Sequence, residues 1–153
     1  MDVLDHILEE HQKFREMASA VESSEGKDKK KLFRQLYAEV KGHHEAEEHV
    51  VFPDVKAQVE GEDLELVKEM VEEHSLGGYQ FSVLERTSVE NDTWDAKFTV
   101  LVEVLDHHME EEEQEFIPLA REALSKSELE AKLKAFEDTK KKYVAEMQKK
   151  LKD

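Results

Sequence analysis

Two segments of this chain carry the same arrangement of His, Glu and Pro. One begins at His43 and reads HHEAEEHVVFP, and the other begins at His108 and reads HMEEEEQEFIP. In each segment the first His precedes a Glu by four positions, Glu47 or Glu112, and precedes a Pro by ten. Four residues span about one helical turn, roughly 6 Å along the axis, so each pair places an imidazole and a carboxylate on one helix face. This spacing is typical of metal ligands, and its repetition predicts two ligand pairs.

The repeat extends upstream of both segments. The tripeptide EEH ends at His11, 32 positions before His43, and again at His74, 34 positions before His108. The chain therefore reads as two copies of a helix pair. Each copy offers one His from its first helix and a His with a Glu from its second. The predicted metal ligands, sufficient for a dinuclear centre with open coordination positions, are His11, His43, Glu47, His74, His108 and Glu112.

The helical register leaves an alternative, because His44 and His107 are also followed by a Glu after four positions. Apolar periodicity does not choose between the two registers in the second helix. The repeat does choose, since only His43 and His108 both stand ten residues before a Pro. We therefore expect His44 and His107 to lie behind the ligands or on the surface.

The two glutamates of the repeat need a positive partner. Glu47 and Glu112 continue lines of apolar residues, which aims them at the interior, and a buried carboxylate without a partner costs several kcal/mol. No Lys or Arg occupies the neighbouring core positions of the first four predicted helices. Neutral imidazole combined with carboxylate is a ligand set that suits Fe, Mn or Zn. We expect both carboxylates to bridge two similar ions, which such ligands hold about 3.5–4 Å apart.

Helical periodicity of apolar residues predicts the elements that position these ligands. The predicted helices cover about residues 4–21, 28–61 with a kink or break near Pro53, 63–89, 94–119 and 127–151. Short connections between the first four predict an all-α, up-down-up-down four-helix bundle. Ser127 and Glu130 match the spacing of a capping box at the start of the fifth helix.

Residues 1–124 are predicted to form this bundle, and residues 125–153 an additional Lys-rich amphipathic helix. Its apolar face either packs on the bundle or joins a protein partner. Packing within the chain is favoured, because an isolated amphipathic helix gains most from nearby tertiary contacts.

Composition agrees with a single helical domain. The 153 residues include only five Gly and two Pro, and 39% are charged. This leaves few sites for the tight turns of a β-fold. The absence of Cys excludes thiolate sites and iron–sulfur clusters.

Charge is unevenly distributed along the chain. The net charge is −16, yet residues 125–153 hold nine Lys against six Asp and Glu, so residues 1–124 carry −19. Such a body repels nucleic acid and anionic membranes. The acidic, amphipathic N-terminus is unlike a secretory signal, and no apolar run reaches the roughly 20 residues of a membrane span. We expect a soluble, cytoplasmic protein that binds neither nucleic acid nor membrane.

Gly78 lies inside the third predicted helix, one turn beyond His74. A Gly in the interior of a helix lowers helix stability by about 1 kcal/mol relative to Ala, so we expect a packing or functional reason for Gly at this position. Two explanations are open at this point. Gly78 either leaves an apolar pocket beside the metals for a diatomic molecule or peroxide, or allows a neighbouring helix to pack closely.

The two EEH tripeptides and the two His-to-Pro segments resemble the hemerythrin-like (HHE cation-binding) family, over residues 1 to about 124. The resemblance implies a four-helix bundle with a non-haem, oxo- or hydroxo-bridged di-iron site that meets O₂ or related small oxidants. By this resemblance the six predicted ligands are iron ligands. Mn and Zn suit the same donors.

Two positions differ from the oxygen-carrying hemerythrins. Gly78 stands where they have a second His in the third helix, and Glu112 replaces their final Asp. A site with four His and two Glu favours oxidised iron and argues against reversible O₂ carriage. Family members with fewer His resemble sensors, iron-handling proteins, or proteins that react with peroxide and nitric oxide.

Our leading hypothesis is a di-iron protein that binds or reacts with O₂, peroxide or nitric oxide. The residues leave open whether it is an oxidoreductase or a binding protein. The alternative is an iron-dependent sensing or interaction module that signals to a protein partner through the C-terminal helix. A third, weaker hypothesis is a structural bundle that binds adventitious Zn.

Overall fold

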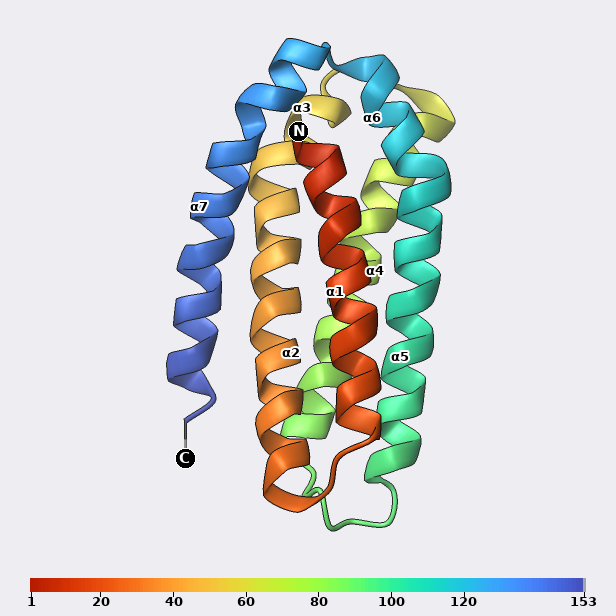
Figure 1. Cartoon of the computed structure of the whole chain (residues 1–153). Helices are drawn as coiled ribbons and strands as arrows, with labels where there is room; N and C mark the ends of the chain where they lie inside the picture. Colours follow the sequence, from red (N-terminus) through yellow and green to blue (C-terminus); the bar gives the residue numbers. More distant parts are fainter. Residues whose placement is uncertain (153) are drawn as a thin grey trace.

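The computed structural model describes residues 1–152, and its regular elements are all helices. The long helices are α1 (Val3–Glu22), α2 (Gly26–Ala46), α4 (Gly61–Glu85), α5 (Trp94–Glu111) and α7 (Lys126–Lys150). The first four alternate in direction and enclose a common core, while α7 runs back along the outer side of α2 (Figure 1). The predicted all-α four-helix bundle with an additional C-terminal helix is confirmed.

Both copies of the repeat leave α-helical geometry at the ligand Glu. The short elements there are η1 (Glu47–Val51) and α3 (Phe52–Lys56) after α2, and η2 (Glu112–Phe116) and α6 (Ile117–Ala123) after α5. The η segments are π-helical turns, in which the Phe52 amide donates to the Glu47 carbonyl five residues back. A Pro lacks an amide hydrogen and collides with the carbonyl four residues back, which the wider turn relieves. The kink expected near Pro53 is therefore a π-helical turn.

The apolar core is divided into two clusters. One lies toward the α3 and α6 end and includes Val3, Phe116 and Phe136. The other fills the opposite end, where the Trp94 and Phe98 rings stack with centroids 5.3 Å apart. The predicted ligands lie in a polar layer between these clusters. Close-packed side chains above and below restrict how far that layer can relax.

Helix α7 packs closely against α2. Leu129, Phe136 and Met147 of α7 are buried. At the crossing, a Cβ added to Gly42 would lie 2.5 Å from Val144 Cγ2 and 2.8 Å from the Lys140 carbonyl oxygen. Only a residue without a side chain allows the two backbones to approach this closely.

The start of α7 differs from the sequence prediction. The capping box is formed by Ser125 and Glu128, which exchange two side-chain-to-backbone hydrogen bonds of 3.1 Å each. The predicted pair, Ser127 and Glu130, has the same spacing but lies inside the helix. The prediction of this pair is wrong, because two overlapping Ser-x-x-Glu patterns satisfy the same rule and the end of α6 decides which one starts the helix.

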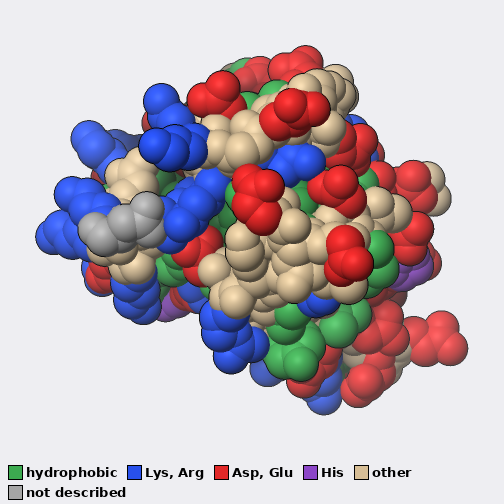
Figure 2. Space-filling model, turned by 90° about the horizontal axis from the view of Figure 1, so that it is seen from below, with side chains coloured by type: hydrophobic (Ala, Val, Ile, Leu, Met, Phe, Trp, Pro, Cys, Tyr) green, Lys and Arg blue, Asp and Glu red, His purple; other side chains and the backbone are tan. Residues whose placement is uncertain are grey.

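The charged surface has a basic region on an otherwise acidic protein. Viewed from the lower end of the bundle, many Lys and Arg gather around the C-terminal end of α7, whereas Asp and Glu are more frequent toward the opposite side of this face (Figure 2). Lys27, Lys30 and Lys31 of α2 and Lys152 line the same surface hollow. Within residues 1–152, no helix combines the length and the apolar character needed to cross a membrane.

Candidate metal centre

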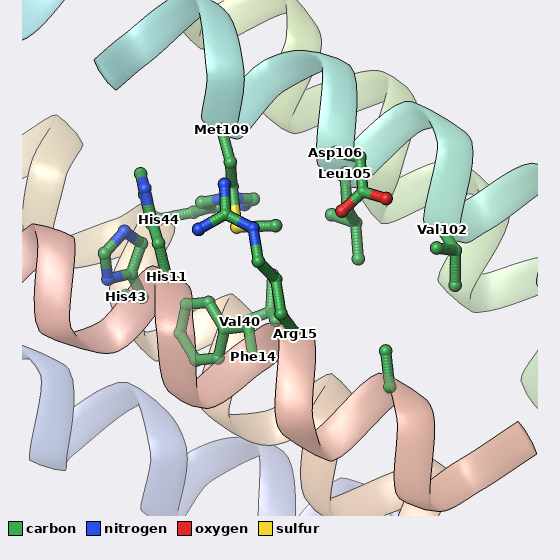
Figure 3. A pocket seen from close by; sticks show the side chains of 11 residues that line it. His11, Phe14, Arg15, Val40, His43, His44, Val102, Leu105, Asp106 and Met109 are labelled. Carbon is green, nitrogen blue, oxygen red and sulfur yellow. The ribbon is translucent and has the colours of Figure 1, made fainter. Parts of the chain in front are cut away.

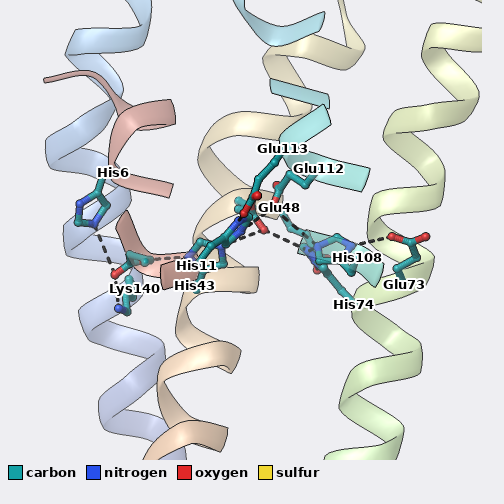
Figure 4. A network of polar contacts seen from close by, with 12 residues as sticks. His6, His11, His43, Glu48, Glu73, His74, His108, Glu112, Glu113 and Lys140 are labelled. Atoms are coloured by element: carbon teal, nitrogen blue, oxygen red, sulfur yellow. Dashed lines mark hydrogen bonds and ion pairs between the residues drawn. The ribbon is translucent and has the colours of Figure 1, made fainter. Parts of the chain in front are cut away.

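The structure brings the six predicted ligands together in the middle of the bundle, and all of them are buried (Figure 4). Together with His44, these residues form two groups of potential ligand atoms that share Glu47. Within each group the atoms lie no more than 4.8 Å apart. We name these groups by the helix that completes them. The α1-side position comprises His11, His43, Glu47 and Glu112. The α4-side position comprises His44, His74, His108 and Glu47.

Each ligand carboxylate lies between the two positions. The distances between carboxylate Oε1 and imidazole Nε2 are 3.5 Å from Glu47 to His43, 3.1 Å from Glu47 to His74, 2.9 Å from Glu112 to His11, and 3.9 Å from Glu112 to His108. One oxygen of each carboxylate thus faces a histidine of both positions. This is the placement of a carboxylate that can bridge two ions.

Several buried polar atoms at the centre of the cluster have no hydrogen-bond partner. They are Nε2 of His11 and His43 and both carboxylate oxygens of Glu47 and Glu112. His11 Nε2 lies 2.9 Å from Glu112 Oε1, but the two groups are not aligned as a hydrogen bond. Leaving a buried polar atom unpaired costs about 1–3 kcal/mol, and more for a charged group. Bound cations would satisfy all six atoms.

The pKa values of the clustered side chains also indicate a site that can take up cations. Burial, followed by the neighbouring Glu112 carboxylate, raises the pKa of Glu47 well above its usual value. Burial alone would lower the pKa of His11, but Glu112 and Glu113 outweigh it and raise this pKa to about 9. Burial lowers the pKa of His43 to about 4, so its ring stays neutral. Protons therefore partly neutralise the metal-free cluster, and a cation can replace them.

Each of the four predicted histidine ligands turns its Nδ1 toward a second carboxylate. These backing carboxylates lie 2.7 Å from the ring nitrogen in the pairs His11–Glu113, His43–Glu10, His74–Glu48 and His108–Glu73. In a neutral ring the contact selects the tautomer with Nδ1 protonated, and the unprotonated Nε2 then faces the metal position. A carboxylate behind the ring also makes the imidazole a stronger base.

Sequence reasoning missed the backing carboxylates, although the repeat contains a signal for them. Glu10 and Glu73 are the second Glu of the two EEH tripeptides, and each contacts the second-helix His of its own copy. Glu48 and Glu113 directly follow the two ligand glutamates, and each contacts the first-helix His of the other copy. The repeat therefore encodes the ligands together with the groups that orient them.

His44 is not where the sequence analysis placed it. Its ring stacks on that of His74 with centroids 3.7 Å apart, and it belongs to the α4-side group. Successive residues on a helix point about 100° apart, and α2 is covered on two sides. His43 faces Phe14 of α1 and Phe136 of α7, whereas His44 faces α4. The sequence predicts His44 behind the ligands or on the surface, whereas a ring nitrogen of His44 lies among the potential ligand atoms of the α4-side group.

His107 lies on the surface, with 70% of its side chain exposed. Its Nε2 is 3.2 Å from a Glu111 carboxylate oxygen and 3.7 Å from one of Glu73. These three residues form a third, exposed group of potential ligand atoms. Within residues 1–152, no further helix covers the outer side of α5 as α7 covers that of α2, so His107, the residue beside His108, stays in solvent.

A small apolar cavity of about 20 Å³ borders the cluster (Figure 3). Its lining includes His11, His43 and His44, with Leu105 and Met109 on the α5 side. This volume accommodates one water-sized molecule.

Gly78 does not line that cavity. A Cβ added there would meet nothing within 4 Å, so close helix packing does not explain this glycine. Gly78 instead borders a wider groove of about 460 Å³, together with Tyr37, His44 and His74. Of the two explanations left open by the sequence, the structure thus leaves the one with open space beside the cluster, here a wide groove. His44 lines both this groove and the small cavity.

Comparison with known proteins agrees with this geometry. The family model "Hemerythrin HHE cation binding domain" matches residues 2–120. The crystal structure of a hemerythrin HHE cation binding domain-containing protein from Mycobacterium kansasii is similar, with a TM-score of 0.86 and 22% sequence identity. The alignment covers 99% of this chain and 92% of that chain, so it includes most of α7, and at this identity it shows the shared fold. No curated protein matches the chain.

Proposed function

Because this chain belongs to the hemerythrin HHE cation-binding domain family, we propose that its buried cluster holds two iron ions and that this centre binds or reacts with O₂, peroxide or nitric oxide. One observation carries the proposal: six polar atoms of four buried side chains face one another without hydrogen-bond partners. The family match and the buried His and Glu groups establish a cation-binding domain. The choice of iron, and its reaction with small molecules, are the proposed part.

The residues fit two ions of a transition metal. The donors are neutral imidazoles and carboxylates, which suit iron and also Mn or Zn. Bound iron would supply the electron transfer and Lewis acidity that these side chains lack. The protein contributes the rest: backing carboxylates orient the rings, Glu47 and Glu112 lie between the positions, and tightly packed apolar clusters limit access of water.

The surroundings of the cluster favour a small ligand. The apolar cavity beside His11 and His43 has room for one molecule of about the size of water. The groove beside Gly78 reaches His44 from the outside, which provides a path toward the α4-side position. His44 also brings the number of histidines in the cluster to five. With five histidines near the two positions, the histidine count does not weigh against O₂ carriage.

Metal analysis combined with absorption spectroscopy tests the proposal. Freshly purified protein should contain, or take up anaerobically, two Fe per chain, and adding O₂, H₂O₂ or nitric oxide should change its visible spectrum. Glu47→Gln removes a bridging carboxylate and should lower iron content below two per chain. Glu45→Gln, on the outer side of the same helix where Glu45 pairs with Lys41, is the matched control. Absence of any spectral response to all three molecules would refute the reactivity.

A second candidate function is iron-dependent signalling through α7. The observation that favours it is a buried connection in which Lys140 of α7 contacts Glu10, and Glu10 contacts His43 (Figure 4). If iron occupancy orders this connection, backbone amides of α7 should exchange with deuterium more slowly in the iron-loaded protein than in the metal-free protein. Equal exchange rates in α7 would argue against this function.

A further inference from the structure

The ligands and their backing carboxylates follow an approximate twofold pattern, since each copy of the repeat supplies equivalent groups. Glu10 and Glu73 are equivalent in the two copies, as are Glu48 and Glu113. This pattern alone would make the two metal positions alike. One difference lies inside the repeat, because His44 adds a third imidazole to the α4-side position and its counterpart in the second copy is Met109. The other differences come from side chains outside the repeat.

On the α1 side, each backing carboxylate has a cation. Lys140 of α7 forms a buried ion pair with Glu10, in which only 11% of the Lys140 side chain is exposed. A second acid near Lys140, Glu39 at 3.6 Å, has its own partner in Lys13. The imidazole of His6 lies 3.5 Å from Glu10. The charge of Glu10 is therefore compensated in the immediate surroundings of His43.

The other α1-side backing carboxylate, Glu113, accepts a 3.0 Å bond from Arg15. The Arg15 side chain is 32% exposed, so solvent screens this pair more strongly than the buried pair of Lys140 and Glu10. Of the two cations, Lys140 is therefore the one that more strongly offsets a carboxylate behind the α1-side ligands.

On the α4 side, the backing carboxylates lack such cations. Within residues 1–152, no Lys or Arg forms an ion pair with Glu48 or Glu73. Their side chains are 29% and 20% exposed, respectively. The further neighbour of Glu73 is the imidazole of His107 at 3.7 Å, whose side chain is 70% exposed, so solvent screens this contact. Behind His74 and His108, the backing carboxylates are therefore not offset by a Lys or Arg of residues 1–152.

These differences bear directly on metal affinity. A carboxylate behind an imidazole strengthens it as a ligand, and a paired cation weakens that effect while repelling the incoming metal ion. We infer that the two metal positions are unequal and that the α4-side position binds a divalent cation first and more tightly. Two features contribute to this order: His44 adds an imidazole to the α4-side position, and Lys140 acts through Glu10 as a positioning residue of the α1-side ligand His43. The inference rests on the proposed function only in assuming that two ions bind.

Titration of the metal-free, full-length protein with Co²⁺ at pH 8 tests the inference. The cobalt absorption bands report coordination, and calorimetry reports affinity. Wild-type protein should bind two Co²⁺ in two resolved steps whose Kd values differ by at least about tenfold. Two steps of equal affinity would overturn the inference and leave the proposed function intact. Fewer than two bound ions would instead contradict the proposed function.

Two sets of variants assign the steps. The double variant Glu48→Gln with Glu73→Gln keeps hydrogen-bond acceptors behind the rings but removes their charge, and should weaken the first step about tenfold without changing the second. Lys140→Met should strengthen the second step about tenfold and leave the first unchanged. Lys134→Met, on the exposed face of α7, is the matched control and should change neither step.

The direction of the Lys140→Met effect separates a charge effect from a structural one. If Lys140 only anchored α7, its loss would loosen the site and weaken the second step, which would refute its role in setting the order. An unchanged second step would refute that role as well. If this variant does not fold, the glutamine variants still decide whether the α4-side position fills first, since equal weakening of both steps would contradict it.

Discussion

Asp2 combines two roles at the start of α1. Its carboxylate accepts a 2.9 Å hydrogen bond from the Asp5 amide and another of 2.9 Å from the Arg121 guanidinium. Burial would raise the pKa of Asp2, but the Asp5 hydrogen bond and Arg121 outweigh it, so this pKa lies below the model-peptide value of 3.8. Asp2 therefore caps the first helix and attaches it to α6 by charge.

Replacing Asp2 with Asn separates the charge from the cap, because Asn caps helices about as well as Asp. Asp2→Asn should lower the free energy of unfolding by about 0.5 kcal/mol at pH 7, a small value because Arg121 is 42% exposed and the pair is screened. The pKa of Asp2 is lower in the folded state than 3.8. The stabilisation of wild type over Asp2→Asn is therefore complete above pH 3.8, and it is lost as the pH falls through the folded-state pKa.

Chemical denaturation between pH 3 and pH 7 measures this difference. Asp92→Asn is the control, because Asp92 lies exposed in a loop without an ion-pair partner within residues 1–152. A difference between wild type and Asp2→Asn that stays constant over the whole pH range would contradict the assigned role of the charge.

At the scale of elements, the contact between α2 and α7 depends on one glycine. The Cβ of an alanine at Gly42 would collide with the Lys140 carbonyl oxygen, which belongs to the backbone and cannot move independently of α7. Gly78, in the interior of α4, faces open space instead. The same substitution at the two positions should therefore have opposite effects.

Gly42→Ala should destabilise the protein by about 1–2 kcal/mol, because overpacking costs about 1–3 kcal/mol and the gain in helix propensity returns at most about 1 kcal/mol. Gly78→Ala should stabilise it by about 0.5–1 kcal/mol through propensity alone. Thermal and urea denaturation of both variants measure these changes. A Gly42→Ala protein as stable as Gly78→Ala would show that α7 does not approach α2 as closely as described.

At the scale of the whole molecule, the metal centre opposes folding until cations bind. Two buried carboxylates and two imidazole nitrogens without hydrogen-bond partners share the middle of the bundle. Ions that bind only the folded state stabilise it by mass action, by about 2.7 kcal/mol per site at a free concentration one hundred times Kd. Metal binding and stability of this bundle should therefore be strongly linked.

Removal of metal by a chelator should lower the Tm by about 5–10 °C for each site that is emptied, since 1 kcal/mol shifts the Tm of a domain of this size by about 2–4 °C. Calorimetry of chelated protein before and after adding back Fe²⁺ under anaerobic conditions measures the shift. Glu47→Gln should show a smaller response to Fe²⁺. A Tm that is independent of metal would contradict the placement of the ligands in the core.

The positions of the six predicted ligands followed from the sequence because helical periodicity is local. Residues four apart, such as His43 and Glu47, share one helix face in any environment, and the duplicated Pro identifies the same face in both copies. The all-α bundle followed equally from apolar periodicity, short connections and the scarcity of Gly and Pro.

The surroundings of those ligands depend instead on how the helices pack. His44 enters the cluster because α7 and α4 cover two sides of α2, whereas His107 on α5 is 70% exposed. Lys140 reaches Glu10 across 130 positions of sequence, a contact that no local period encodes. Local spacing determines which face of a helix a residue occupies. The neighbour that meets this face depends on how the whole chain packs.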